Sequence, residues 1–397
     1  MNGKRRLKMK QLTRLFIPIC LETLFYMLSG MVDTLMLSAV GDYAVGAVGT
    51  ANSYIGIFII MFSIISSGMV SVMTQNIGAG RPGVAYQARQ LGLLFNAVAG
   101  VLMAVFLFSG AGAILRMVGI ADALYEPALI YLKIVGGGCI LNAVIPIFSS
   151  YLRAFGYTKQ PLYATIVGNI ANFVMNAVFL FVLHKGVAGV ATATVISKIL
   201  NLCIVLYFSH KLISAKNSTE RIANKTVLGQ IVKVGLPSAC ETALYNVAMM
   251  LVIRFLNQMD AEGLNVTARS YTATISNFSY CVGAALAQAN AIMTGWHIGA
   301  GELEECDRGT KRAAFVGVCV AVCMETAIVL GSGFIMPLFT DNPEMTALVR
   351  KLLAIDIVLE IGRVTNLVFG QALKTSGDAV FPAVIAAVFM FVFAVGG

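Results

Sequence analysis

The sequence predicts an all-α polytopic membrane protein built from two related six-helix bundles. Of its 397 residues, 58% are hydrophobic and only 12% are charged, about half the charged share of a typical soluble domain. Apolar runs of about twenty residues, the length that crosses a bilayer as a helix, recur from end to end. The first run also contains a stretch, PICLETLFY from Pro18, that returns as PSACETALY from Pro237.

The apolar runs predict eleven membrane spans, and the longer ones are expected to tilt in the bilayer. The predicted spans cover about 15–38, 47–76, 90–115, 128–151, 161–183, 187–209, 234–257, 270–296, 312–336, 346–372 and 380–395. A polar, basic stretch divides them into two halves. The predicted organisation is an N-terminal bundle of spans one to six (1–209), a cytoplasmic linker (210–233) and an incomplete C-terminal bundle of spans seven to eleven (234–397).

The internal duplication extends beyond the first span of each half. IGAG at 77–80 recurs at 298–301, and LRAFGYTKQP at 152–161 matches LKTSGDAVFP at 373–382, both at the same offset. Because each half begins on the same side of the membrane, the repeats are predicted to be parallel, related by a pseudo-two-fold axis along the membrane normal. The pattern predicts a twelfth span that this chain lacks, and an abrupt end in an apolar run favours a fragment.

Basic residues predict the orientation. The N-terminal tail is rich in lysine and arginine, the loop at 41–46 has none, and later loops alternate in the same way. The positive-inside rule therefore predicts a multi-pass protein of the plasma (inner) membrane with a cytoplasmic N-terminus. The net charge of +9 is interpreted as this topology signal and not as a nucleic-acid surface.

Two carboxylates mark one face of the first span. Glu22, Tyr26 and Asp33 project within about 60° of one another on a helix, and the two acids lie about 16 Å apart along its axis. A charge in lipid costs roughly 2.5–3.5 kcal/mol, so this face should meet a cleft or other helices. A carboxylate there can bind Na+ or take up a proton, and either event can bias a two-state gate.

We therefore predict cation-coupling roles for Asp33, for Glu22 and for Glu241, the repeat counterpart of Glu22. The alternative is a carboxylate that only pairs with a neighbouring helix. On span five, Asn172 and Asn176 share one helix face with Asn169. Their amide oxygens can complete a cation shell with Asp33, which makes Na+ at Asp33 the one metal expected, or they can act as interhelical hydrogen-bond partners.

The predicted substrate contacts come from both halves of the chain. Tyr26 and Tyr245 each lie one turn after a repeated glutamate. Asp356 and Glu360 lie one turn apart on span ten, with Arg363 three residues further on, and an internal ion pair is the alternative for these acids. Glu325 is isolated within span nine and is interpreted as structural.

The sequence contains no nucleotide-binding loop, HExxH or nucleophile motif, so it predicts neither an ATP-driven pump nor any other enzyme. Its eight cysteines form no CxxC pair, which argues against a metal or disulfide framework. No organic cofactor is expected.

Four motifs together resemble the MATE (multidrug and toxic compound extrusion) family, within a superfamily that includes lipid-linked oligosaccharide flippases. They are MVDTLMLSAVG at 31–41, TQNIGAGRPGVA at 74–85, LRAFGYTKQP with NIANFVMNAVFLF at 169–181, and GVAGVATAT at 186–194. The resemblance implies two six-helix bundles around a V-shaped cleft, and export of amphipathic, often cationic compounds driven by Na+ or H+.

The same resemblance matches Asp33 to the family's span-one aspartate, and Asn172 and Asn176 to its Asn-x-x-x-Asp/Asn pair. Glu241 lies near the start of span seven, where some members carry a functional glutamate. Arg363 stands where members often carry an aspartate, which departs from a second-bundle Na+ site.

The resulting prediction is a secondary antiporter, a monomer in the lipid bilayer that exports small organic molecules and binds no nucleic acid. One alternative is a flippase for lipid-linked sugars or lipids, which would favour a strongly basic cleft and more than twelve spans. The other is a transport-inactive membrane subunit or fragment, and its support is the missing twelfth span.

Overall fold

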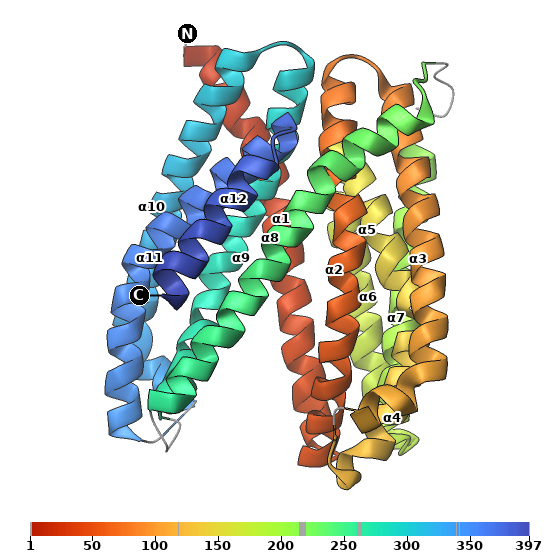
Figure 1. Ribbon diagram of the computed structural model, residues 1–397, viewed down its shortest axis with the longest axis vertical. Helices are drawn as coiled ribbons and strands as arrows, with labels where there is room; N and C mark the ends of the chain where they lie inside the picture. Colours follow the sequence, from red (N-terminus) through yellow and green to blue (C-terminus); the bar gives the residue numbers. More distant parts are fainter. Residues whose placement is uncertain are drawn as a thin grey trace. The chain divides into compact units, whose positions relative to one another are not determined.

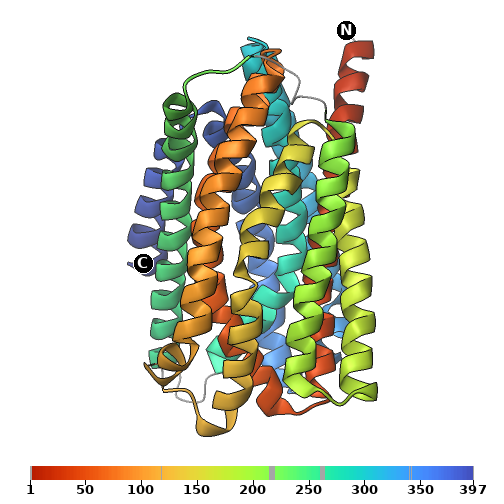
Figure 2. The same cartoon turned by 90° about the vertical axis from the view of Figure 1, so that its right-hand side faces the viewer.

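The computed structural model describes the backbone of residues 2–117, 119–213, 220–259, 264–338, 340 and 342–396; the side chains of 2–9, 42, 63, 257, 259 and 338 are outside this description. Across those ranges the chain is helical and contains no strand (Figure 1, Figure 2). The helices are α1 (Asn2–Ser38), α2 (Asp42–Gly78), α3 (Pro82–Met117), α4 (Asp122–Gly137), α5 (Cys139–Ala154), α6 (Lys159–Ala177), α7 (Gly186–Leu212), α8 (Asn224–Met259), α9 (Leu264–Gly299), α10 (Leu303–Ile335), α11 (Pro343–Ser376) and α12 (Val380–Phe389). Short turns of other helix types extend α6 (Val178–Val182), α10 (Met336–Leu338) and α12 (Met390–Val395).

Each predicted span falls on a helix, and the span from 128 to 151 falls on two. By length and composition, seven helices within the described ranges are apolar and long enough to cross a membrane, or eight if the bent pair α4 and α5 forms one span. The all-helical membrane fold is thus confirmed, while the count of eleven spans stays a prediction. The side chains of the basic tail residues 4–8, together with Lys216, Asp260 and Glu262, lie outside what the structure describes.

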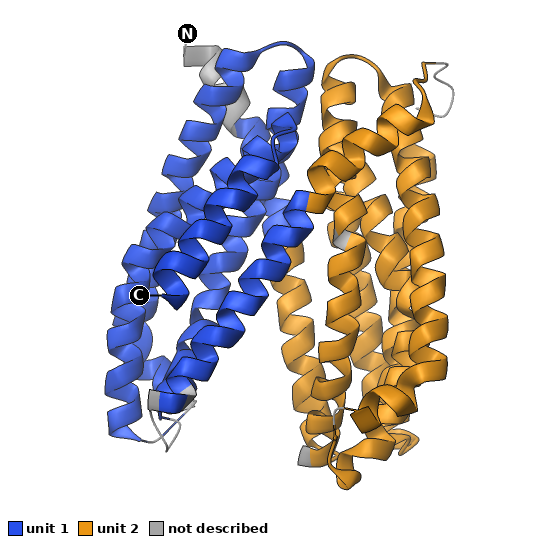
Figure 3. Cartoon of the chain, in the orientation of Figure 1, with its two compact units in different colours: residues 1–20, 237–397 blue, residues 21–236 orange. Residues whose placement is uncertain are grey.

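The helices form two compact units, residues 21–236 and residues 1–20 with 237–397 (Figure 3). Helices α1 and α8 each pass from one unit to the other, at Cys20–Leu21 and at Leu236–Pro237. Both passages lie within three residues of the repeated prolines, Pro18 and Pro237. The division into 1–209, 210–233 and 234–397 describes the sequence repeat and stays a prediction.

The duplication is present in the backbone conformation as well as in the sequence. Gly80 and Gly301 have φ of 73° and 76°, and Gly156 and Gly377 have φ of 82° and 100°. Both pairs are related by the offset that relates the repeated motifs. In all four turns the glycine N–H donates to the carbonyl three residues earlier. These left-handed residues follow the ends of corresponding helices, where glycine costs least.

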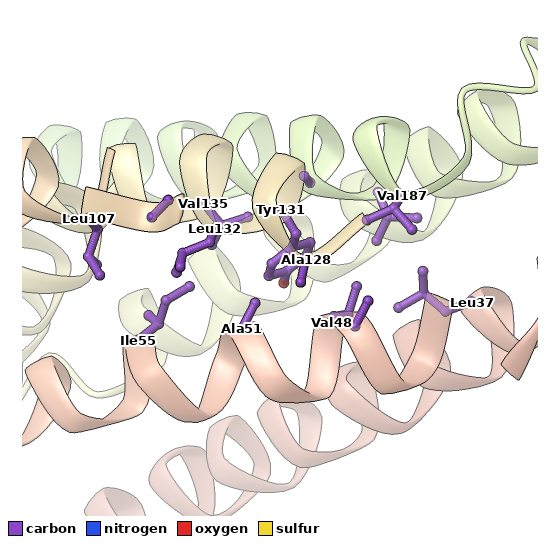
Figure 4. Packing of buried hydrophobic residues seen from close by; sticks show 14 of the residues in the cluster. Leu37, Val48, Ala51, Ile55, Leu107, Ala128, Tyr131, Leu132, Val135 and Val187 are labelled. Carbon is purple, nitrogen blue, oxygen red and sulfur yellow. The ribbon is translucent and has the colours of Figure 1, made fainter. Parts of the chain in front are cut away.

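Among its described residues, the unit of residues 21–236 has two hydrophobic clusters. One joins α2 and α4 through side chains such as Val48, Ile55 and Leu132, with Val187 of α7 at its edge (Figure 4). The other joins α2, α3, α5 and the start of α8. Between α4 and α5 the chain bends by 42°, at the run of glycines that ends with Gly138.

The start of α8 crosses α2 at very short range. A methyl group on Gly68 would lie 1.9 Å from the carbonyl oxygen of Ile231, and one on Gly235 would lie 1.8 Å from that of Ile64. Because glycine has no side chain, Gly68 and Gly235 allow the backbones of α2 and α8 to approach this closely. The crossing holds the first turns of α8 within the unit of residues 21–236.

The other unit shows the reciprocal arrangement. Here the start of α1 supplies Leu12, Leu15 and Ile19, which pack against α9 side chains such as Ala285 and Ile292. The first turns of α1 therefore belong to the unit of residues 237–397, and the first turns of α8 belong to the unit of residues 21–236.

We expect Gly68→Ala and Gly235→Ala each to lower the melting temperature of the detergent-solubilised protein. Each methyl group would collide with a backbone carbonyl, and overpacking of this kind costs about 1–3 kcal/mol. The matched controls are Gly49→Ala on α2 and Gly229→Ala on α8, where an added methyl group meets nothing within 4 Å. Equal melting temperatures for all four variants would contradict the close crossing.

Candidate functional site

A hydrogen-bonded network joins α1 to α6 in the unit of residues 21–236. The side-chain nitrogen of Asn176 donates to Asp33 Oδ1 at 2.8 Å and to Asn172 Oδ1 at 3.1 Å. Asn176 and Asn172 are buried, at 0% and 5% exposed, and Asp33 is half-buried. The structure thus brings together three residues that the sequence predicted as neighbours, although their role in cation coupling stays a prediction.

The side-chain carbonyl oxygen of Asn176 is the atom of this network that is available to a further partner. Oδ1 of Asn176 is buried and has no hydrogen-bond partner among the described residues. Leaving a buried acceptor unpaired costs about 1–3 kcal/mol. Beside a carboxylate, such an oxygen is a ready ligand for Na+, which binds oxygen donors, or an acceptor for a protonated carboxyl group.

A lysine that sequence reasoning missed belongs to the same region. Lys198 of α7 donates from Nζ to Asn142 Oδ1 at 2.8 Å and interacts electrostatically with Asp33. It is the one charged residue within the predicted span 187–209. A lone charge in an apolar span is the sequence signal that indicates a functional residue here. When protonated, Lys198 places a positive charge near Asp33, with which any arriving cation must compete.

Glu22 has a different polar partner from Asp33. Its Oε1 accepts from Arg153 Nη2 of α5 at 2.6 Å, while its Oε2 is buried without a hydrogen-bond partner among the described residues. Asn169 donates to the Phe25 carbonyl oxygen at 2.9 Å, so it links α6 to the α1 backbone. The predicted coupling role of Glu22 and the substrate role of Tyr26, 69% exposed, stay predictions.

The unit of residues 237–397 contains the counterpart of that ion pair. Glu241 of α8 lies 2.8 Å from Lys374 Nζ at the end of α11. Tyr245, one turn later, is 48% exposed and lies close enough to Tyr280 of α9 to interact with it electrostatically. The predicted roles of Glu241 and Tyr245 also stay predictions.

A trio of carboxylates lies between α10 and α11 in this unit. Glu325, Asp356 and Glu360 are all buried, and one oxygen from each lies within 4.8 Å of the others. Arg363 donates to Glu360 at 2.7 Å and to Asp356 at 3.4 Å. The internal ion pair considered for Asp356 and Glu360 is therefore formed, and Glu325, isolated in the sequence, is their neighbour in space.

The charges of the trio do not balance. Three carboxylates face one guanidinium, and both oxygens of Glu325 are buried without a hydrogen-bond partner among the described residues. The Ser279 hydroxyl donates its hydrogen bond to Glu360, at 3.3 Å. Like charges at this range oppose ionisation of all three groups, so the trio is suited to hold a proton or another small cation.

Comparison with known proteins identifies the family of the chain. A family model described as MatE matches residues 18–178 and 237–396, which are the two repeats, each beginning at its proline. The chain is 32% identical over 380 residues to "Uncharacterized transporter YisQ" of Bacillus subtilis (strain 168), covering 94% of this chain and 83% of the relative.

Solved structures share the fold at lower identity. "Outward-facing conformation of a multidrug resistance MATE family transporter of the MOP superfamily" superposes with a TM-score of 0.86 at 20% identity, over 98% of this chain and 87% of the other. "Crystal structure of MATE in the straight conformation" gives 0.85 at 21% identity, with 98% and 87% covered. A Pyrococcus furiosus transporter described by "Reverse polarity of binding pocket suggests different function" gives 0.81 at 19%, with 97% and 88% covered.

We expect Arg363→Met to lower the melting temperature markedly. It removes the only cation bonded to the trio among the described residues, and losing one partner of a buried pair costs about 3–5 kcal/mol, less here because Arg363 is 30% exposed. Adding Glu360→Gln to this variant should recover at least half of the loss, because one uncompensated charge disappears. The control is Arg308→Met, whose exposed pair with Glu304 is worth about 0–1 kcal/mol. A double variant no more stable than Arg363→Met would refute repulsion within the trio.

Proposed function

Because the chain belongs to the MatE family of transporters, we propose that it is a secondary antiporter exporting amphipathic, often cationic organic compounds in exchange for Na+ or H+. The observation that carries the proposal is the Asp33–Asn176–Asn172 network, which combines a half-buried carboxylate with an unpaired buried oxygen on two adjoining helices. A group that ionises inside an apolar helical bundle is costly, and such groups commonly serve ion pathways and proton relays.

The coupling step follows from charge. When Asp33 is ionised, it accepts a hydrogen bond from Asn176 and is partly compensated by Lys198. Binding of Na+ or a proton neutralises Asp33 and changes the bonding of Asn176. The free side-chain oxygen of Asn176 can then bind the ion or accept a hydrogen bond from the protonated acid. Contacts between α1 and α6 therefore differ between the two states, which is the condition for a cation to shift a conformational equilibrium.

The proposed substrate contacts come from both units, Tyr26 from one and Tyr245, Asp356 and Glu360 from the other. Asp356 and Glu360 carry more negative charge than Arg363 compensates, so the group attracts organic cations. Tyr26 and Tyr245 are 69% and 48% exposed, and their rings offer a face to apolar or cationic compounds. We place the protein as a monomer in the plasma membrane with a cytoplasmic N-terminus, using no organic cofactor and binding no nucleic acid.

A flippase for an anionic lipid-linked substrate is the second candidate. The observation in its favour is that basic side chains such as Lys198 and Arg363 lie within the bundles, where they would attract a phosphate-bearing headgroup. Both already face carboxylates, so the local charge favours a cation and the antiporter. The remaining alternative, a transport-inactive subunit, predicts no movement of any substrate.

The primary test is Asp33→Asn in the full-length protein, reconstituted in vesicles with an imposed Na+ or pH gradient. We expect efflux of a fluorescent organic cation to fall at least about tenfold, a change of about 1.4 kcal/mol, because Asn binds neither a proton nor Na+ as a carboxylate does. The gradient that drives the wild type identifies the ion. The control is Asp122→Asn, an exposed aspartate at the start of α4. Undiminished efflux by a well-folded Asp33→Asn protein would exclude Asp33 from coupling.

A second expectation concerns the ammonium group of Lys198. Lys198→Met keeps much of the side-chain volume but removes the ammonium that competes for Asp33. The concentration of coupling cation that half-saturates transport should therefore fall several-fold. Titration of Na+ or H+ in the same vesicles measures it, with Lys185→Met, in the exposed turn before α7, as the control. An unchanged or higher half-saturating concentration would show that Lys198 does not oppose the cation.

A further inference from the structure

The two halves of the chain repeat a glutamate and a basic residue as a set. Glu22 and Glu241 each lie four residues after a repeated proline. Arg153 and Lys374 occupy the same place in the two matching stretches LRAFG and LKTSG. Each member of the set in the first half therefore has its counterpart at the equivalent position of the second half, so the set follows the duplication.

The structure joins the members of each set. Arg153 Nη2 lies 2.6 Å from Glu22 Oε1, and Lys374 Nζ lies 2.8 Å from Glu241 Oε2. The four side chains are between 12% and 21% exposed. Both partners of the first pair lie in the unit of residues 21–236, and both partners of the second lie in the unit of residues 237–397. The same ion pair is therefore built twice, once inside each unit.

Both ion pairs lie where a helix enters its second unit, which indicates a common structural role. Helices α1 and α8 enter their second unit at Leu21 and at Pro237, and each glutamate follows within one or two turns. Each basic residue is three positions before a left-handed glycine, Gly156 or Gly377, that follows the end of α5 or α11. Each pair thus fastens a helix that has just crossed to the end of a helix in the unit that it enters.

We propose that Glu22–Arg153 and Glu241–Lys374 are matched positioning pairs that anchor α1 and α8, and that neither glutamate is a ligand of the coupling ion. A coupling ligand has to gain and lose a cation during each cycle, whereas these carboxylates are in direct contact with a basic side chain, at 2.6 Å and 2.8 Å. Asp33, by contrast, accepts its hydrogen bond from the neutral amide of Asn176. An anchor requires opposite charges at the two positions but not a carboxylate at a particular one. The anchoring role goes beyond the proposed antiport and does not rest on it, whereas the statement about the coupling ion rests on the proposed function.

The test exchanges the charges within each pair. In the full chain, Glu22→Arg and Glu241→Lys alone place two like charges together, and we expect at least a tenfold loss of transport with a lower melting temperature. The reciprocal swaps, Glu22→Arg with Arg153→Glu and Glu241→Lys with Lys374→Glu, should restore transport to within about threefold of the wild type. The half-saturating concentration of the coupling cation should remain unchanged in both swaps.

The duplication offers a matched control of identical net charge. Glu22→Arg combined with Lys374→Glu introduces the same residue types as a swap but places them in different pairs, so it should stay inactive and unstable. The conservative variants Arg153→Lys and Lys374→Arg should retain transport. These variants also separate anchoring from a general loss of fold, since each swap contains the same substitution as its inactive single variant.

Two results would overturn the proposal. One is a swap variant that regains its melting temperature but not transport, or that changes the dependence on the coupling cation, because a carboxylate would then be needed at Glu22 or Glu241 itself. The other is a swap that is no more stable than its single variants. The melting temperature reports whether the ion pairs are formed even if no organic cation is transported. Failure of the antiport proposal is therefore distinguishable from failure of the anchoring proposal.

Discussion

The structure depends on one constraint: a charge within an apolar helix has to be compensated by another group of the same unit. Several acidic residues within the helices meet it with a basic neighbour, as Glu22 does with Arg153, Glu241 with Lys374 and Glu360 with Arg363. Ion pairs inside a low-dielectric bundle are costly to break by removing one partner. Those that join two helices therefore fix which helices stay together while a transporter changes state.

Comparison of the two repeats shows which polar interactions are common to both halves of the chain and which are specific to one half. The pairs near the repeated prolines occur in both units, as do the left-handed glycines that follow the helix ends. Among the described residues, the Asn172–Asn176 network occurs only in the first half, and the trio around Glu325 only in the second. Shared features suit anchoring, which each bundle needs, whereas divergent ones suit tasks that two bundles divide between them.

Much of the candidate site followed from periodicity and from the family resemblance. Asp33, Asn172 and Asn176 were predicted as neighbours, and the structure places them within hydrogen-bond distance. Lys198 and Glu325 were missed or set aside because each is the lone charge in an apolar run, and helix periodicity cannot say which other helix such a residue meets. Their partners lie on other helices, far away in the sequence.

The sequence by itself determined the all-helical membrane fold, the duplication and the family, because hydropathy, repeats and short motifs are properties of the linear chain. Only the tertiary structure decided that α1 and α8 each change units beside a proline, that Glu22 bonds to Arg153 and not to the Asp33 network, and that Glu325 joins Asp356 and Glu360. These outcomes depend on which helix faces pack against each other. That choice is made by close contacts such as Gly68 on Ile231, which carry no signal in hydropathy.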